Sequence, residues 1–492
     1  MQELSRRVEQ RGAGRRPTDR APFVMPTPRG SGMVRPVSIP ASVLDQIGNT
    51  PMLRVSRIDT GPCELYLKLE CQNPGGSIKD RIGLFMVRAA EQAGKLGPHQ
   101  PKLVEATAGN TGLALALVSA VRNYQLTLVI PDKMSQEKIA HVKALGAQVV
   151  MARSDVGKGD PEYYQEVAAR IAEETGAFYV NQFGNEANPQ THETWTGPEI
   201  GAQLAFDLDA MVVGVGSGGT LTGLSRYFSR AIPNCELVLA DPKGSILADY
   251  IHTGKYGAAG SWVVEGIGED FLPDILDLTR CKTAYTIDDR ESLETARLLL
   301  KSEGILGGSS SGTLLAAALR YCRAQTTKKR VCTFVCDSGN KYLSKMFNDH
   351  WMVDAGFTQR ERRGDLRDVV TRQYADRAVV VVSPDDTLLT AHARMKLYDV
   401  SQLPVLSGDR VVGMLDESDL ILAALNDESK LRGKVESVMS TRLKTVDVKT
   451  PLEQVMPLLD AGYVPIVVDG DAFVGLLTRM DVLNHLRRRL LR

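Results

Sequence analysis

The sequence has no long run of apolar residues and no excess of either charge. Its longest mostly apolar stretch, Leu113 to Val121, is far shorter than the roughly 20 residues that span a bilayer, and no apolar core follows the arginine-rich start as in a secretory signal peptide. Basic and acidic residues number 59 each, so no net field draws the chain to nucleic acid or to an anionic membrane. We therefore expect a cytosolic protein whose partners are small molecules, with no nucleic acid and no membrane.

Cysteine is also scarce, with seven residues spread over 492. An odd, scattered set is typical of reduced thiols rather than of a disulfide framework. The closest pair, Cys332 and Cys336, lies in an apolar run, and alternation along a strand would place both thiols on one face. Because the sequence has no Cys-x-x-Cys pair, we expect these thiols to pack in the core and predict no metal site.

The first 40 residues differ in composition from the rest of the chain. Residues 1–40 contain eight arginines, three acidic residues, six prolines and four glycines, and they lack cysteine and histidine. Such a segment buries too little apolar surface to offset the entropy lost on ordering. We therefore expect residues 1–40 to form a flexible basic arm.

Short apolar runs alternate with longer helical stretches over residues 41–355, which predicts an α/β core with a parallel sheet. Examples of the apolar runs are Thr127 to Ile130, Met211 to Val213 and Leu237 to Ala240. About 300 residues are many for a single sheet, so we expect two lobes.

The sequence then repeats itself. After a charged segment at 356–370, which we interpret as a linker, Gly413 to Asp419 recurs as Gly475 to Asp481. One such unit is too small to bury its own apolar face. We therefore expect two packed copies, at 371–430 and 431–492.

The segment Asn73 to Arg81 places a lysine near the start of a predicted helix. Ser77 and Asp80 match a capping box, which would make Lys79 an ordinary lysine of the first turn. The positive end of the helix dipole disfavours a charged ammonium, however, and a lowered lysine pKa is what covalent chemistry with a carbonyl group requires. The spacing leaves both interpretations open. We expect the helix to bury one face, formed by Ile82, Phe85, Met86, Ala89 and Ala93.

Two further segments lead through small polar residues into a helix. Leu103 to Gly112 is typical of a strand followed by a turn whose backbone N–H groups suit a carboxylate. Glu303 to Thr313 contains three consecutive serines before a helical run. Taken singly, the first segment is equally compatible with an ordinary capped turn, and the second is best interpreted as a Gly/Ser loop that caps a helix.

The segment Met211 to Thr220 has four glycines within six residues, between a strand and a helix. Glycines let the backbone wrap an anion closely. Gly216 to Thr220 would therefore cup a phosphate group. Gly214, Gly216 and Gly219, followed by Asp241, also satisfy a dinucleotide-binding pattern, so this segment alone does not decide between the two.

Together these motifs resemble the β-family of pyridoxal phosphate enzymes, and within it the cystathionine β-synthases. The resemblance is carried, in this order, by Asn73 to Arg81, Thr107 to Gly112, Gly216 to Thr220 and Gly304 to Gly312. It implies the two-lobed, parallel-sheet core of the tryptophan synthase β-like fold. The C-terminal repeat resembles the paired CBS-domain module of these synthases.

The resemblance also implies the cofactor, pyridoxal 5'-phosphate, and the residues that bind it. Lys79 would hold the cofactor covalently and act as general base, Asn110 would meet the phenolic oxygen of the ring, and Ser310 would meet the ring nitrogen. The phosphate group would be bound by Gly216, Ser217, Gly218, Gly219 and Thr220. The substrates would be bound by Thr107, Ala108, Gly109, Thr111, Gln182, Gly268 and Glu269.

The implied reaction is a β-replacement that joins serine or O-acetylserine to homocysteine and gives cystathionine, with release of hydrogen sulfide from cysteine as a side reaction. Position 108 is Ala where many relatives have Ser, and position 269 is Glu where the animal and yeast synthases have Tyr. Both changes leave open whether the first substrate is serine or O-acetylserine. A cysteine synthase is the near alternative, and a non-catalytic adenylate sensor the distant one.

Three more expectations follow from the resemblance. Haem-bearing members have Cys and His ligands in the N-terminal extension, whereas here the first such residues are Cys63 and His99, so we predict no haem. In the repeat, Thr478 and Asp481 match a site for an adenosyl ligand such as S-adenosylmethionine or AMP, and Asp419 is the matching acid of the first copy. The family suggests a homodimer or homotetramer.

Overall fold

The computed structural model describes residues 39–490, except for 108, 133–135, 359 and 427. The chain divides into a unit that ends at Asp45 and a second unit from Gln46 to Arg492. The basic arm predicted for residues 1–40 therefore lies almost wholly outside the described residues. Within the described ranges, no helix is long and apolar enough to cross a bilayer.

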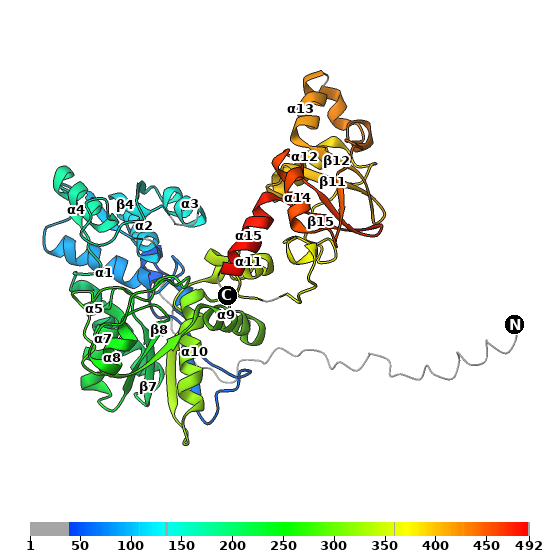
Figure 1. The fold of residues 1–492 in the computed structure, drawn as a ribbon. Coiled ribbons are helices and arrows are strands. Elements are labelled where there is room, and N and C mark those ends of the chain that lie inside the picture. The colour runs from blue at the N-terminus through cyan, green and yellow to red at the C-terminus, as the bar shows by residue number, and fades with distance from the viewer. Residues whose placement is uncertain (1–38, 108, 133–135, 359, 427, 491–492) are drawn as a thin grey trace, which may run out of the picture. The chain divides into compact units, whose positions relative to one another are not determined.

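The second unit contains a six-stranded sheet in the order β1-β2-β10-β7-β8-β9, of which β7 and β8 are labelled in Figure 1. Only β1 is antiparallel to its neighbour, and every other pairing in this sheet is parallel. The strands are β1 (Met52–Arg54), β2 (Glu64–Lys68), β7 (Ala210–Gly214), β8 (Glu236–Pro242), β9 (Cys281–Ile287) and β10 (Arg330–Phe334).

A smaller sheet of four parallel strands has the order β5-β4-β3-β6. With the larger sheet it forms the two-lobed parallel core predicted from the alternating pattern. Its strands are β3 (Lys102–Ala106), β4 (Gln125–Pro131), β5 (Gln148–Ala152) and β6 (Phe178–Tyr179).

Helices cover both sheets. In the larger sheet, α7 and α10 pack on β7, and β7 and β8 are buried along almost their whole length. This burial explains their continuous apolar runs, since a parallel strand covered on both faces has no solvent side. The helices are α1 (Lys79–Gln92), α2 (Asn110–Arg122), α3 (Gln136–Ala144), α4 (Tyr164–Thr175), α5 (Ala187–Thr191), the π-helical η3 (His192–Thr196), α6 (Gly197–Gln203), α7 (Gly219–Ala231), α8 (Leu247–Thr253), α9 (Asp289–Glu303), α10 (Ser309–Arg323) and α11 (Asp349–Asp354).

Helix α1 differs from the single apolar face that we predicted. Phe85 is only half-buried, and Ala93 lies beyond the last helical residue and is exposed. In contrast, Asp80 and Arg81 are fully buried. The first two turns are thus buried on most sides, because α1 packs against both α2 and α5.

The C-terminal repeat forms two similar units, each with its own buried cluster. In the first copy, β11 and β12 pair antiparallel. In the second, β13 pairs parallel to β14, and β14 antiparallel to β15. The elements are α12 (Leu388–Tyr398), β11 (Gln402–Ser407), β12 (Arg410–Asp416), α13 (Glu417–Asn426), β13 (Thr445–Asp447), α14 (Leu452–Asp460), β14 (Ile466–Asp469), β15 (Ala472–Leu476) and α15 (Arg479–Leu490).

Candidate active site

Lys79 is the first residue of α1 and follows a tight turn. Gly76 has a φ of 78°, in the left-handed region that favours glycine. The Ser77 hydroxyl accepts the N–H of Lys79 at 3.2 Å, and the carboxylate of Asp80 accepts the N–H of Gly75 at 2.5 Å. The two residues of the predicted capping box therefore hold the turn that presents Lys79.

The surroundings of Lys79 favour the neutral form of its amine. Burial lowers the pKa of this amine, and the neighbouring Cys336 and Glu269 act in the opposite direction. A lysine must be neutral to act as a nucleophile or as a base. The position of Lys79 therefore suits covalent chemistry rather than the role of an ordinary charged surface lysine.

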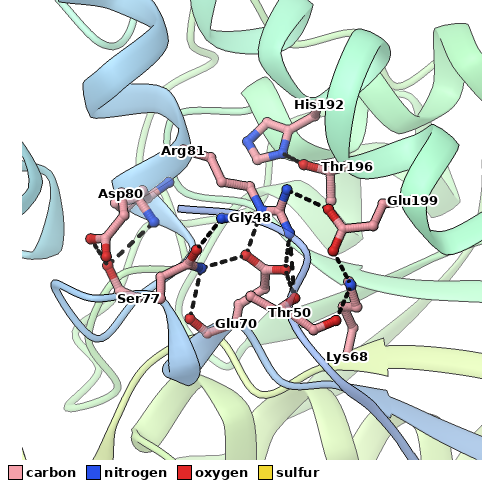
Figure 2. A network of polar contacts seen from close by, with 12 residues as sticks. Gly48, Thr50, Lys68, Glu70, Ser77, Asp80, Arg81, His192, Thr196 and Glu199 are labelled. Atoms are coloured by element: carbon pink, nitrogen blue, oxygen red, sulfur yellow. Dashed lines mark hydrogen bonds and ion pairs between the residues drawn. The ribbon is translucent and has the colours of Figure 1, made fainter. Parts of the chain in front are cut away.

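A buried network of ion pairs fixes the start of α1 (Figure 2). The guanidinium of Arg81 donates two hydrogen bonds to Glu70, at 2.7 and 2.8 Å, and one to Glu199 at 2.8 Å. Lys68 donates to Glu199 at 2.5 Å and to the carbonyl oxygen of Thr50 at 2.6 Å. The two cations, Arg81 and Lys68, thus neutralise the two carboxylates, Glu70 and Glu199. The four side chains meet where α1 contacts β2 and α6, and Arg81 is two residues after Lys79.

The glycine loop before α7 leaves no room for side chains. Gly218 has a φ of 88°. A Cβ on Gly219 would lie 2.0 Å from Asn188 Oδ1, and a Cβ on Gly216 would lie 2.6 Å from the carbonyl oxygen of Gly266. The loop leads into the N-terminus of α7, where free backbone N–H groups and the helix dipole favour an anion. This cradle fits a phosphate group.

Two side chains of the loop are held from the neighbouring helices. The amide of Asn188 donates to Ser217 Oγ at 2.9 Å, and His192 Nε2 lies 3.2 Å from Thr220 Oγ1. The other ring nitrogen of His192 lies 3.0 Å from Thr196 Oγ1. Burial holds the pKa of His192 well below its usual value, so the ring is neutral and carries one donor and one acceptor. The sequence did not lead us to His192.

The three serines at the start of α10 have different partners. Ser309 Oγ accepts the N–H of Glu265 at 3.0 Å, and Ser311 Oγ accepts the N–H of Cys336 at 2.9 Å. Ser310, between them, is buried and hydrogen-bonded to the Cys336 thiol. The loop is therefore tied to the segment after β10, and Ser310 lies close to Lys79 through their shared neighbour Cys336.

Our expectation that Cys332 and Cys336 pack with the core is confirmed, but the two thiols do not share a strand. Cys332 is buried in the main core, but β10 ends at Phe334, so Cys336 lies beyond the strand and beside Lys79 and Ser310. Burial raises the pKa of the Cys336 thiol to about 12. Cys336 is therefore a neutral thiol at the cleft.

The turn before α2 brings together several of the predicted substrate-binding residues. Thr107 Oγ1 accepts the N–H of Gly109 at 3.2 Å, and Thr111 Oγ1 donates to Gln182 Oε1 at 2.7 Å. Thr107, Thr111 and Gln182 are all buried. Ala108 lies outside the described residues. The arrangement places hydroxyl and amide groups beside the N-terminus of α2, as a carboxylate site requires.

Asn110, the first residue of α2, contacts two residues that the sequence did not single out. Its Nδ2 donates to Asp337 at 2.9 Å, and its Oδ1 accepts from Lys341 at 2.7 Å. Asp337 and Lys341 follow the carboxyl end of β10. Polar residues at that edge of a parallel sheet are a signal that could have revealed them, because ligands of open α/β sheets bind there.

Gly268 and Glu269 lie beside the glycine loop, where the N–H of Gly268 donates to the carbonyl oxygen of Val215 at 2.8 Å. Gly268 has a φ of 89°, and the N–H of Glu269 donates to Ser245 Oγ at 3.1 Å. Burial and the neighbouring Asp270 raise the pKa of the half-buried Glu269 well above its usual value. A Cβ on Gly216 would lie 3.9 Å from Glu269 Oε1. Glu269 thus lies between the glycine loop and Lys79.

The predicted regulatory residues do not form one cluster. Thr478 and Asp481 line a cavity of about 430 Å³, whereas Asp419 is not among its lining residues. The carboxylate of Asp481 accepts from Thr478 N at 2.8 Å, from Thr478 Oγ1 at 2.5 Å and from Thr371 N at 3.1 Å. Asp419 and Asp416 instead cap one another through their backbone N–H groups.

Comparison with known proteins identifies the family. The family described as "Pyridoxal-phosphate dependent enzyme" matches residues 43–337, and "CBS domain" matches 367–426 and 435–488. Cystathionine β-synthase of Dictyostelium discoideum is 33% identical, over 91% of this chain and 92% of its own length. The chain belongs to the cystathionine β-synthase family.

Other relatives agree with this membership. The cystathionine β-synthase of Saccharomyces cerevisiae is also 33% identical, over 90% of this chain and 97% of its own length. Among solved structures, O-ureido-L-serine synthase is 34% identical with a TM-score of 0.59, covering 63% of this chain and 96% of its own. The O-acetylserine-dependent cystathionine β-synthase of Helicobacter pylori is 34% identical with a TM-score of 0.57, covering 62% of this chain and 98% of its own. This family member is therefore a pyridoxal-phosphate-dependent enzyme of the β-synthase type, with a C-terminal CBS-domain pair.

Membership of this family favours one of the two interpretations of the glycine loop, the phosphate site. Asp241, the acid of the competing dinucleotide pattern, accepts the N–H of Ala248 at 2.8 Å and so caps the start of α8. Burial raises the pKa of Asp241 to about 6. Asp241 is thus engaged at α8, which favours the phosphate interpretation of the loop.

Proposed function

We propose that this enzyme joins serine or O-acetylserine to homocysteine, forming cystathionine. The observation that carries the proposal is the convergence of four groups on one cleft: the lysine amine with a lowered pKa, the glycine cradle, the serine loop and Glu269. The named synthases among its relatives support the proposal.

The residues of the cleft fit pyridoxal phosphate, which when bound supplies an electron sink that lets a proton leave Cα and a β-substituent depart. The backbone N–H groups of Gly216 to Thr220 would bind its phosphate, and Ser310 would meet the ring nitrogen with its hydroxyl. The amine of Lys79 would hold the cofactor and, when free, would accept the Cα proton as general base. Thr111 and Gln182 hold the carboxylate of the substrate.

Glu269 would select the second substrate. Its carboxyl group is half-buried between the glycine loop and Lys79, so it faces the region where a β-carbon would react. The ammonium group of homocysteine would lower the pKa of Glu269 and form a charge-assisted hydrogen bond with it. Sulfide has no ammonium group and cannot use this contact.

The test compares homocysteine and sulfide as nucleophiles, on both serine and O-acetylserine, for the wild type and Glu269→Gln. We expect the variant to raise the KM for homocysteine roughly tenfold, the size of one lost charge-assisted hydrogen bond, and to leave the rate with sulfide unchanged. Equal losses with both nucleophiles would contradict this role of Glu269. Faster turnover of the wild type with sulfide than with homocysteine would instead identify a cysteine synthase.

We further propose that the CBS-domain pair binds one adenosyl ligand at the cavity that contains Thr478 and Asp481. This cavity is also lined by Asp354, Asp399 and Arg372, so its acids, Asp481 included, outnumber its one base. A ligand with a positive sulfonium, such as S-adenosylmethionine, therefore suits it better than AMP. The same proposal includes the domain bounds: a catalytic core at 41–355, a linker at 356–370 and CBS domains at 371–430 and 431–492. Three expectations stay predictions: that the enzyme has no haem, that it forms a dimer or tetramer, and that it lies in the cytosol.

A further inference from the structure

The amide of Asn110 is held from both ends by ionisable side chains. Lys341 Nζ donates to its oxygen at 2.7 Å, and its nitrogen donates to Asp337 Oδ2 at 2.9 Å. An ammonium group only donates, and the carboxylate oxygen here accepts, so the two ends of the amide are distinguished without ambiguity. The amide nitrogen carries two hydrogens, and the contact with Asp337 uses one of them.

Asp337 connects Asn110 to the serine loop. Tyr342 donates to the same carboxylate oxygen at 2.7 Å, and the N–H of Gly308 donates to the backbone oxygen of Asp337 at 3.0 Å. A Cβ on Gly308 would lie 1.9 Å from Asp337 Oδ1, so this close approach requires glycine. Gly308 caps α10, whose second residue is Ser310. Asp337 thus fixes Asn110 relative to the helix that carries Ser310.

Lys341 has Asn110 as its closest hydrogen-bond acceptor. Its other contacts, the carbonyl oxygens of Gly75 and Gly76, lie at 3.5 and 3.4 Å, which is long for hydrogen bonds. Burial lowers the pKa of Lys341, and the carboxyl groups of Asp337 and Asp80 oppose this. The positive charge of the nearby Lys138 also lowers the pKa of Lys341.

Lys341 lines a cavity whose other residues are not those proposed to bind the cofactor. Together with Cys71, Lys138 and His141, it lines a cavity of about 390 Å³, and neither Lys79 nor Ser310 belongs to that lining.

We propose that Lys341 is a positioning residue for the cofactor, acting through Asn110. The inference rests on the proposed contact between Asn110 and the phenolic oxygen of the ring. The ammonium group of Lys341 fixes the orientation of the amide, so that the second N–H of Asn110 is available to that oxygen. It also polarises the amide and makes this N–H a stronger donor, because hydrogen bonds in a chain reinforce one another.

A double-mutant cycle with Lys341→Met and Asn110→Ala tests this. The measured quantities are the affinity of the cofactor-free protein for pyridoxal phosphate and the pH midpoint of the cofactor's visible absorption. We expect Lys341→Met to weaken cofactor binding roughly tenfold and to shift the midpoint, as for loss of a charge-assisted hydrogen bond. In the Asn110→Ala background, Lys341→Met should have no further effect, because its route to the cofactor is gone. An equal effect in both backgrounds, or none in either, would overturn the inference.

Lys345→Met is the matched control. Lys345 lies four residues further along and pairs with Glu265 at 3.0 Å, while Glu265 keeps Lys138 as its second partner. We expect cofactor affinity and absorption like those of the wild type, and a loss equal to that of Lys341→Met would also overturn the inference. If the wild type itself shows no absorption band that Lys79→Ala removes, the proposed cofactor chemistry fails, which is distinct from failure at Lys341.

Discussion

At the scale of single residues, Glu105 shows how a buried acid can support a binding site. It lies in β3, and its Oε1 accepts from Gln182 Nε2 at 3.2 Å, while Gln182 Oε1 accepts from Thr111 at 2.7 Å. Its other oxygen, Oε2, is buried without a hydrogen-bond partner. Burial raises the pKa of Glu105 to about 8, so the carboxyl group is protonated at neutral pH. A neutral Glu105 therefore holds the side chain that we expect to bind the substrate carboxylate.

This raised pKa predicts a pH-dependent stability. Because the folded state holds the proton more tightly than the unfolded state, whose ordinary value is 4.5, the contribution is complete below that value and is lost as the pH rises through about 8. The loss is about 1.4 kcal/mol for each pH unit between the two values. Glu105→Gln, a neutral isostere, should remove this loss. The free energy of unfolding of the variant should therefore increase relative to that of the wild type as the pH rises from 5 to 9.

Urea unfolding at several pH values measures the effect. Glu173→Gln, on the exposed side of α4, is the control and should run parallel to the wild type at every pH. A constant difference between Glu105→Gln and the wild type across this range would show that Glu105 is ionised in the folded protein.

At the scale of elements, the buried ion pairs of α1 carry a stability prediction. Arg81 is the cation that contacts Glu70, and both side chains are fully buried. Replacing one partner of a buried pair leaves an uncompensated charge, which costs about 3 to 5 kcal/mol. Arg81→Met should therefore lower the free energy of unfolding by that amount, measured by urea denaturation. Adding Glu70→Gln should restore part of the loss, because the stranded charge is then removed.

The control is an exposed ion pair of the same type. Arg226 pairs with Glu186 on the surface, with side chains 35% and 63% exposed. Arg226→Met should cost about 0 to 1 kcal/mol, since solvent screens such pairs. Equal losses for Arg81→Met and Arg226→Met would mean that the buried network does not stabilise α1.

The elements themselves were largely predictable, and the long-range contacts were not. The runs Thr127 to Ile130 and Met211 to Val213 lie in β4 and β7, as expected, because a strand covered on both faces must be apolar. The burial of Arg81 could not be read from its neighbours. One of its partners, Glu199, lies 118 residues away, and only the fold brings the two together. Asp337 and Lys341 escaped notice for the same reason, since their partner Asn110 lies in the other lobe.

At the scale of the whole molecule, the balance of 59 basic and 59 acidic residues conceals local differences. The C-terminal repeat shows one such local difference in charge. In the second copy, Asp481 is fixed by a hydroxyl and two backbone N–H groups and lines the cavity, whereas in the first copy Asp416 replaces the hydroxyl. The first copy thus lacks the hydroxyl that would contact an adenosyl ligand, and its second carboxylate would in addition repel the phosphate of AMP. We therefore expect a single ligand site for each chain.

Titration calorimetry with S-adenosylmethionine and with AMP tests this expectation. Binding of one S-adenosylmethionine for each chain, stronger than that of AMP, should be lost in Thr478→Val, because the variant removes the hydroxyl that lines the cavity and holds Asp481. Asp419→Asn changes the matching acid of the first copy and should leave both affinity and stoichiometry unchanged. Two bound ligands, or a loss in Asp419→Asn, would contradict the single site. Heat from neither ligand would mean that the module serves the structure of the enzyme rather than its regulation.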